Sequence, residues 1–267
     1  MKRLFVVLAL ALAASFAAAS AAPAASGMVY LEDMTWTEVR DAIGAGRTTV
    51  IVPVGGTEQS GPHLALGKHN VRVHVLAGRI AGELGNALVA PVVAYVPEGR
   101  IDVPSGHMRF PGTISISDDA FRGVLEGAAR SLRQAGFRDI VLIGDHGGYQ
   151  AQLQAVATRL DREWAGTPAR VHYIAEYYRA GEAPYVQALR EHGLSAAQIG
   201  THAGAADTSL MLAVDPRLVR ADRLAAASVP GDGVAGDPRP SSAALGQLGV
   251  DLIVARSVAA IRRAVTR

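Results

Sequence analysis

Three groups of side chains in this chain combine imidazoles with carboxylates, the groups that bind divalent metals or transfer protons near neutral pH. They are Glu58 with His69, the adjacent pair Asp145 and His146, and His202 with Asp207. Each group has a simpler interpretation, because a single loop histidine is usually solvated and Asp145 could cap the next helix. Side chains of these types indicate a metal or hydrolase site only if the fold brings them together.

The elements around these residues predict such a convergence. An apolar, β-branched run over 48–54 leads into a Gly/Pro-rich loop, and an amphipathic helix is expected over 70–85. Asp145 directly follows a second apolar run, 139–144. In open α/β sheets, ligands bind in loops at the carboxyl ends of strands. A loop as long as 55–69 is also more often functional than a plain connector.

The remaining pattern predicts one α/β domain with a mainly parallel sheet flanked by helices. Strands are expected over 48–54, 87–96, 139–144 and 170–175, with Pro91 interrupting the second. Helices are expected over 35–45, 70–85, 119–136, 150–164, 184–192 and 242–265. The segment 200–209 is expected to open a further apolar helix that ends at about residue 214. The irregular segments 97–113, which contains His107, and 176–201 are expected to determine specificity.

The N-terminus reads as a secretory signal peptide over 1–25, followed by the α/β domain over 26–267. Lys2 and Arg3 precede a short apolar run and an Ala-rich segment with cleavage sites at 19–21 or 22–24. An uncleaved anchor is the alternative, but the apolar run is shorter than the roughly 20 residues of a spanning helix. We therefore expect a periplasmic or secreted protein with no stable membrane anchor after cleavage.

Composition narrows the function classes further. The chain has 26 basic and 24 acidic residues, and removal of Lys2 and Arg3 leaves 24 of each. Such a balance gives no basic stripe for nucleic acid, so we expect no nucleic-acid partner. Because the chain has no cysteine, disulfides, thiolate metal sites and a catalytic cysteine are excluded.

Four stretches together resemble the creatininase (creatinine amidohydrolase) family, in the family's order. They are Pro53–Gly67, His107–Thr113, Gly144–Gly148 and His202–Ser209. The resemblance implies an α/β sandwich with a parallel core, a homo-oligomer such as a hexamer, and metal-dependent hydrolysis of non-peptide C–N bonds in small, often cyclic, amides. It also places a catalytic histidine at His202, and Asp207 where the family has a Glu.

The chain departs from the two-metal pattern of that family. Glu58 and His146 match ligand positions, whereas Ser60, His69 and Gly148 stand where the family has a His, a bridging Asp and a Glu. A register shift of one residue would align Asn70 instead of His69. The expected ligand set is therefore Glu58, His69 and His146, for one divalent ion.

Two imidazoles and one carboxylate suit Zn²⁺, the expected ion, and also suit Fe²⁺ or Mn²⁺. The hypothesis is a hydrolase in which a metal-activated water attacks a small amide and His202 or Asp207 handles protons. His63, His107, Asp145 and Ser60 are expected in the pocket wall or behind the metal ligands. The alternative is a periplasmic protein of the same fold that binds a metal or small molecule without catalysis.

Overall fold

A computed structural model describes residues 28–226 and 229–266, and the predicted signal peptide lies outside these ranges. Its centre is a four-stranded sheet in the order β2-β1-β3-β4, with every pairing parallel. The strands are β1 (Thr49–Val54), β2 (Ala87–Val89), β3 (Asp139–Gly144) and β4 (Arg170–Tyr173). The prediction of a mainly parallel sheet is confirmed.

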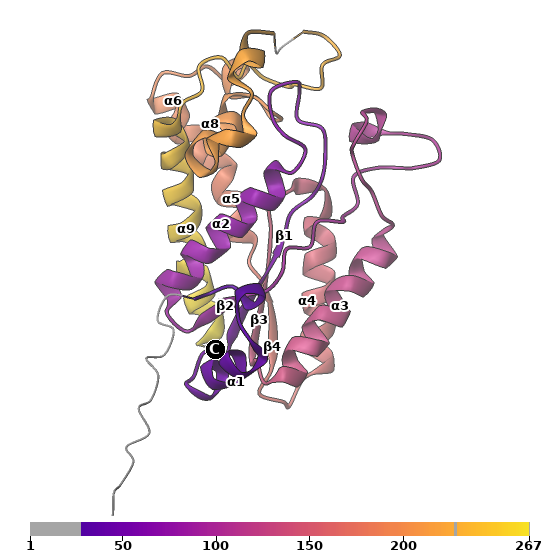
Figure 1. Cartoon of the computed structure of the whole chain (residues 1–267), viewed down its shortest axis with the longest axis vertical. Helices are drawn as coiled ribbons and strands as arrows, with labels where there is room; N and C mark the ends of the chain where they lie inside the picture. Colours follow the sequence, from indigo (N-terminus) through magenta and orange to yellow (C-terminus); the bar gives the residue numbers. More distant parts are fainter. Residues whose placement is uncertain (1–27, 227–228, 267) are drawn as a thin grey trace, which may run out of the picture.

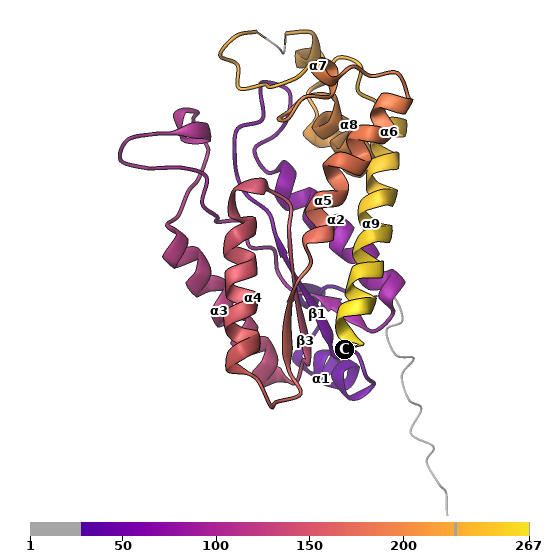
Figure 2. The same cartoon turned by 180° about the vertical axis from the view of Figure 1, so that it is seen from behind.

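Helices cover both faces of this sheet, as the two opposite views in Figures 1 and 2 show. One layer contains α3 (Asp118–Ala135) and α4 (Gln150–Glu163). The other contains α2 (Lys68–Leu84), α5 (Ala175–Gly181) and α9 (Ala243–Val265). Side chains alternate between the layers, so Ile51 packs in one core and its neighbours Val50 and Val52 in the other. Burial on both faces explains why the strand is apolar without alternation.

Local signals set the ends of several helices. Thr35 and Glu38 form a complete capping box at the start of α1 (Trp36–Gly44). Ser117 caps α3, and Gly136 ends it in a left-handed conformation with φ 111°. The upper part of the molecule holds α6 (Ala183–Glu191), α7 (Ala196–Ile199) and α8 (Ala205–Val214), all three labelled in Figure 2. Short 3₁₀ segments are Leu31–Asp33, Gly106–Arg109, Gly147–Tyr149, Pro216–Leu218 and Ala221–Ala226.

Two predicted strands are shorter than expected. The strand predicted over 87–96 is regular only as far as Val89, because Pro91 has no N–H to donate. The chain then continues beside β1 and forms a single bridge between Val93 and Val54. The strand predicted to Ala175 ends at Tyr173, and Ala175 instead begins α5, a helix that the irregular pattern did not predict.

Helix α9 is long and apolar enough to cross a membrane by length and composition, and it is the one such helix within the described residues. In the fold it packs against α8, α5 and α2, and half of its most apolar window is buried. The close approach to α8 requires glycine, since a Cβ at Gly246 would lie 1.8 Å from the Ser209 carbonyl oxygen. Packing of a core helix is therefore sufficient to explain its apolar composition.

Candidate metal centre and active site

The candidate site lies at the carboxyl ends of the strands, where the loops after β1 and β3 approach the start of α8 (Figure 1). A cavity of about 740 Å³ opens there, and its lining includes Glu58 and four histidines. The histidines are His69, His107, His146 and His202. The three groups of polar residues separated in the sequence thus meet at one end of the sheet.

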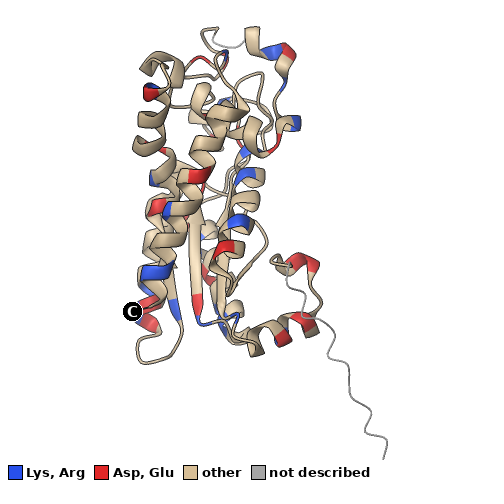
Figure 3. Cartoon of the chain, turned by 90° about the vertical axis from the view of Figure 1, so that its left-hand side faces the viewer, with Lys and Arg blue, Asp and Glu red and all other residues tan. Residues whose placement is uncertain are grey.

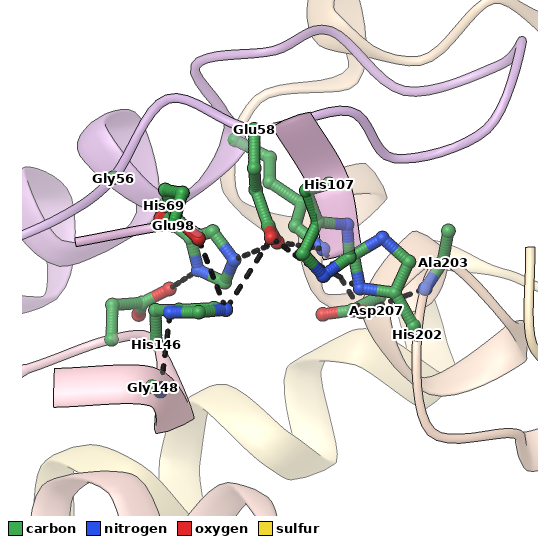
Figure 4. A network of polar contacts seen from close by, with 12 residues as sticks. Gly56, Glu58, His69, Glu98, His107, His146, Gly148, His202, Ala203 and Asp207 are labelled. Atoms are coloured by element: carbon green, nitrogen blue, oxygen red, sulfur yellow. Dashed lines mark hydrogen bonds and ion pairs between the residues drawn. The ribbon is translucent and has the colours of Figure 1, made fainter. Parts of the chain in front are cut away.

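Glu58 is at the centre of this cluster and its side chain is fully buried. Figure 4 shows His69 and His146 on one side of it and His107 and His202 on the other. His69 Nε2 is 2.8 Å from Glu58 Oε1, and His146 Nε2 is 3.3 Å from Oε2. His107 Nε2 is 3.2 Å from Oε2, and His202 Nδ1 is 3.7 Å from Oε1. One carboxylate therefore contacts four imidazoles.

Two triplets in this cluster have the geometry of a metal site. In Glu58, His69 and His146, and also in Glu58, His107 and His202, the potential ligand atoms lie within 4.8 Å of one another. The first triplet is the predicted ligand set. The second Glu58 oxygen is buried without a hydrogen-bond partner, as a carboxylate oxygen suited to a cation would be. The donors present therefore fit a divalent ion.

His69 is oriented by a carboxylate behind it. It stands in the first turn of α2, with Nδ1 2.5 Å from Asp145 Oδ1, so that Nε2 faces Glu58. Such a carboxylate–imidazole pair fixes the ring and raises its basicity as a ligand. Asn70 is directed elsewhere and accepts a hydrogen bond from Gly56 N–H. The geometry thus favours the register with His69 in the site.

Asp145 is itself held by two buried donors. Arg72 Nε donates to both of its carboxylate oxygens, at 2.9 and 3.1 Å, and the Tyr177 hydroxyl donates at 2.7 Å. Burial alone would raise the pKa of Asp145, but the charge of Arg72 and the hydrogen bond with His69 lower it. Asp145 therefore remains ionised and available to orient His69.

Glu58 also stays ionised although it is buried. Burial acts to raise its pKa, and the close contacts with His146 and His69, together with the charge of Lys68, lower it well below the usual range. Lys68 has no exposed surface and its Nζ is 3.6 Å from Glu58 Oε1. The cluster therefore presents an anionic ligand within the cavity.

The third group, His202 and Asp207, reaches the same cavity from the start of α8. His202 Nε2 donates to the Gln59 carbonyl oxygen at 3.0 Å, which turns Nδ1 toward Glu58. Burial, with the charge of Lys68, lowers the pKa of His202 to about 4. Asp207 accepts bonds from Lys68 Nζ, Arg72 Nη1 and Ala203 N–H. Burial acts to raise the pKa of Asp207, but the charges of Lys68 and Arg72 lower this pKa well below its ordinary value.

The other predicted residues lie at different depths. His107 lines the cavity, with Nδ1 2.9 Å from Gln59 Nε2. His63 is fully buried, and its Nε2 is 2.9 Å from the Thr208 hydroxyl. Ser60 is also fully buried, and its hydroxyl has no hydrogen-bond partner. Neither His63 nor Ser60 lines the cavity, so both lie in the layer behind its wall.

Four residues that sequence reasoning missed belong to this network: Lys68, Arg72, Glu98 and Tyr177. Lys68 and Arg72 are four residues apart on the helix face that also carries His69, a spacing that could have revealed them. Glu98, in the loop after β2, has a fully buried side chain whose Oε2 is 3.5 Å from His146 Nε2. Burial and the adjacent charge of Glu58 raise its pKa to about 9.

Charged side chains elsewhere are of both signs and are scattered over the helices and loops, as Figure 3 shows for one side of the chain. Some form pairs between neighbouring helices, such as Arg130 with Glu163 and Arg159 with Glu126, which join α3 to α4. The ion pairs at the site differ from these because both partners are largely buried. Buried ions are costly unless they are paired, so a group of buried charges is unusual in a folded protein.

Comparison with known proteins assigns this arrangement to a family. A family model described as creatinine amidohydrolase matches residues 32–261. Creatinine amidohydrolase of Pseudomonas putida is 30% identical over 205 residues, covering 74% of this chain and 76% of that protein. A mycofactocin precursor peptide peptidase of Mycolicibacterium smegmatis is 30% identical over 221 residues, covering 74% and 78%.

Solved structures agree with this assignment. A structure described as creatininase Mn has a TM-score of 0.73 at 27% identity, covering 90% of this chain and all of that one. A mutant creatininase described as the Zn-Zn type has a TM-score of 0.71 at 25% identity, covering 90% and 99%. The match over most of the chain, in sequence and in fold, shows that this protein belongs to the creatininase family of metal-dependent amidohydrolases.

Proposed function

We propose that this protein hydrolyses a non-peptide amide C–N bond, cyclic or open-chain, in a small molecule, with one divalent metal bound by Glu58, His69 and His146. The observation that carries the proposal is the convergence of these three ligand groups within 4.8 Å, at the wall of the cavity. Asp145 behind His69 supports it, because ligands of functional metals are usually oriented in this way.

A divalent ion at this site would polarise the amide carbonyl and lower the pKa of a water molecule to about 7. Two imidazoles and a carboxylate are typical of hydrolytic zinc sites, and Mn²⁺ also accepts such ligands. Zn²⁺ and Mn²⁺ are both named for structures of related creatininases. We propose Zn²⁺ first, with Mn²⁺ and Fe²⁺ as alternatives.

His202 is the proposed proton carrier. Its lowered pKa, about 4, keeps the imidazole neutral near pH 7, and Nδ1 faces Glu58 while Nε2–H is held by the Gln59 carbonyl. A neutral imidazole fixed at the edge of the cavity can accept a proton and deliver it to a leaving nitrogen. Because a base with a pKa of about 4 is weak at pH 7, its rate contribution is expected at the lower end of the range for positioned acid–base groups, about 10²-fold.

Asp207 has a different proposed role. Its two oxygens accept hydrogen bonds from Lys68, Arg72 and Ala203, and the lowered pKa keeps it ionised. A carboxylate engaged in this way is a poor proton carrier. We therefore propose that Asp207 positions Lys68 and the backbone beside His202, and that His202 alone of the two moves the proton.

The cavity extends from the metal ligands toward α5, α6 and α7, where Tyr178, Glu182 and Arg190 line it. Apolar side chains, among them Val186 and Ile199, line the same end, and this mixed lining supports a small amide with polar and apolar parts as substrate. Export of the protein and a homo-oligomeric assembly remain proposals that rest on the N-terminal pattern and on the family resemblance.

Elemental analysis of purified protein tests the metal site directly. We expect about one ion per chain in the wild type, and clearly less in His69→Ala, which lacks one ligand. Loaded protein would then be assayed on cyclic amides, linear amides and, because some relatives are named as peptide peptidases, short peptides. A wild-type protein that stays metal-free after reloading would sink the hydrolase proposal and leave the binding protein as the better hypothesis.

A further inference from the structure

We propose that Glu98 is a fourth protein ligand of this metal site, so that two carboxylates and two imidazoles surround the ion. The inference rests on the proposed metal function and extends it to a residue outside the recognised motifs. It follows from the burial of Glu98, from the way its backbone is fixed, and from the groups that it faces.

Both Glu98 carboxylate oxygens are buried and receive no hydrogen bond from a backbone or side-chain N–H, and the carboxyl of Glu58 is their close neighbour. The side chain has no exposed surface. In residues 28–226 and 229–266 its one ion-pair contact is with His146, since Lys68 is directed to Glu58 and Asp207. Beside Glu58, the charged form of this buried carboxyl group is unfavourable by several kcal/mol unless a cation is present. A cation bound between the two groups would therefore stabilise both carboxylates in their charged form.

The backbone around Glu98 holds the carboxylate in place. Ser115 Oγ accepts a hydrogen bond from Glu98 N–H at 3.0 Å and donates to the Gly99 carbonyl at 2.8 Å. Gly56, at φ 152°, gives the carboxylate room, because a Cβ there would lie 2.6 Å from Glu98 Oε1. Such a built cradle indicates a fixed position for the group.

Glu98 faces the ligand atoms of the predicted site. Its Oε2 is 3.5 Å from His146 Nε2, the same nitrogen that lies 3.3 Å from Glu58 Oε2. Gly148 N–H lies 3.2 Å from His146 Nδ1 and turns Nε2 toward both carboxylates. A Cβ at Gly148 would approach the His146 ring to 2.9 Å, so the absent side chain leaves this flank of the ring to the loop of Glu98. His146 is thus shared by two carboxylates.

A divalent ion among these groups would satisfy the oxygens that otherwise lack partners. Two carboxylates also balance the double charge of the ion, which a set of two imidazoles and one carboxylate does not. The additional hard oxygen ligand favours Mn²⁺ more than the predicted triplet alone does. Glu98 would thereby supply a carboxylate ligand from the loop after β2, at a position outside the four sequence stretches that resemble the family.

The test is the affinity of the full-length protein for Mn²⁺ and Zn²⁺, measured by competition with a chelator, in wild type, Glu98→Gln and Glu98→Asp. Glu98→Gln preserves size and removes charge, and Glu98→Asp preserves charge. Asp102→Asn is the matched control, because Asp102 is an exposed carboxylate in the same loop. Circular dichroism establishes that each variant is folded.

We expect Glu98→Gln to bind both ions at least about 100-fold more weakly, since loss of groups behind the ligands already costs 10–100-fold. Glu98→Asp should be intermediate and Asp102→Asn unchanged. The visible spectrum of Co²⁺-loaded protein should change in Glu98→Gln, because one oxygen ligand is lost.

Wild-type affinity in Glu98→Gln, with an unaltered Co²⁺ spectrum, would overturn the assignment of Glu98 and leave the proposed hydrolase intact. Absence of binding by the wild type itself would instead overturn the metal function, and this inference with it. If Glu98→Gln is unfolded, a Co²⁺ spectrum of Glu98→Asp identical to that of the wild type would also count against a direct bond to the metal.

Discussion

Replacement of Arg72 by Met would test whether the buried charge network stabilises the fold as its geometry implies. Arg72 Nη2 is 2.6 Å from Asp145 Oδ1 and Nη1 is 2.9 Å from Asp207 Oδ1, with the side chain 6% exposed. Met retains the apolar stem and removes both contacts. Each carboxylate would then keep only part of its hydrogen bonding, from His69 and Tyr177 or from Lys68 and Ala203.

Removal of one partner from a buried ion pair typically costs 3–5 kcal/mol, because the remaining charge is left without compensation. We therefore expect Arg72→Met to lower the free energy of unfolding at pH 7 by about 4 kcal/mol. Folding holds the pKa values of Asp145 and Asp207 below their ordinary range, so their stabilisation is present above about pH 4 and is lost as the pH falls. The difference between wild type and variant should accordingly shrink on acidification.

The assay is urea unfolding followed by circular dichroism, with chelator present so that metal binding does not contribute to stability. Arg79→Met is the control, since Arg79 is exposed on the same helix and its replacement should change stability by less than about 0.5 kcal/mol. A loss below about 1 kcal/mol at pH 7, or a difference that widens in acid, would refute the reasoning.

Three further outcomes are expected. Gly78→Ala should destabilise the protein by about 1–3 kcal/mol in urea unfolding, because its Cβ would lie 2.0 Å from the Tyr30 hydroxyl, whereas Gly82→Ala, in open space on the same helix, should stabilise it by about 0.5–1 kcal/mol. In the metal-free folded protein, His202 takes up its proton only near pH 4, whereas in the unfolded chain a histidine does so near pH 6.5. The unfolded state therefore binds this proton first, and His202 destabilises the folded state as the pH falls below about 6.5. His202→Gln should therefore gain relative to the wild type over that window, by up to about 3 kcal/mol, and a constant difference would contradict the assignment. Addition of Zn²⁺ or Mn²⁺ at about 100 times its dissociation constant should stabilise the wild type by about 2.7 kcal/mol, and no rise in melting temperature would count against binding to the native state.

The sequence alone was sufficient for the parallel sheet, for most of its covering helices and for the end of the sheet at which the candidate site lies. β1 and β3 are apolar runs of β-branched and aliphatic residues, and Thr35, Ser117 and Gly136 mark helix ends through local hydrogen bonds or a left-handed backbone. These are effects of neighbouring residues, which a sequence carries directly. The convergence of the loops after β1 and β3 followed as well, since parallel strands end at the same edge.

Only the tertiary structure decided how charges are shared within the site. Arg72 pairs with Asp207 across 135 residues, and Lys68 is buried beside Glu58, although Lys and Arg are ordinarily on the surface. Glu98 in a Gly/Pro-rich loop carries no local sign that it turns inward toward His146. Burial and pairing depend on which distant segments fold over a residue. Composition and periodicity could therefore predict that the histidines lie at the site, but not which charged side chains surround them.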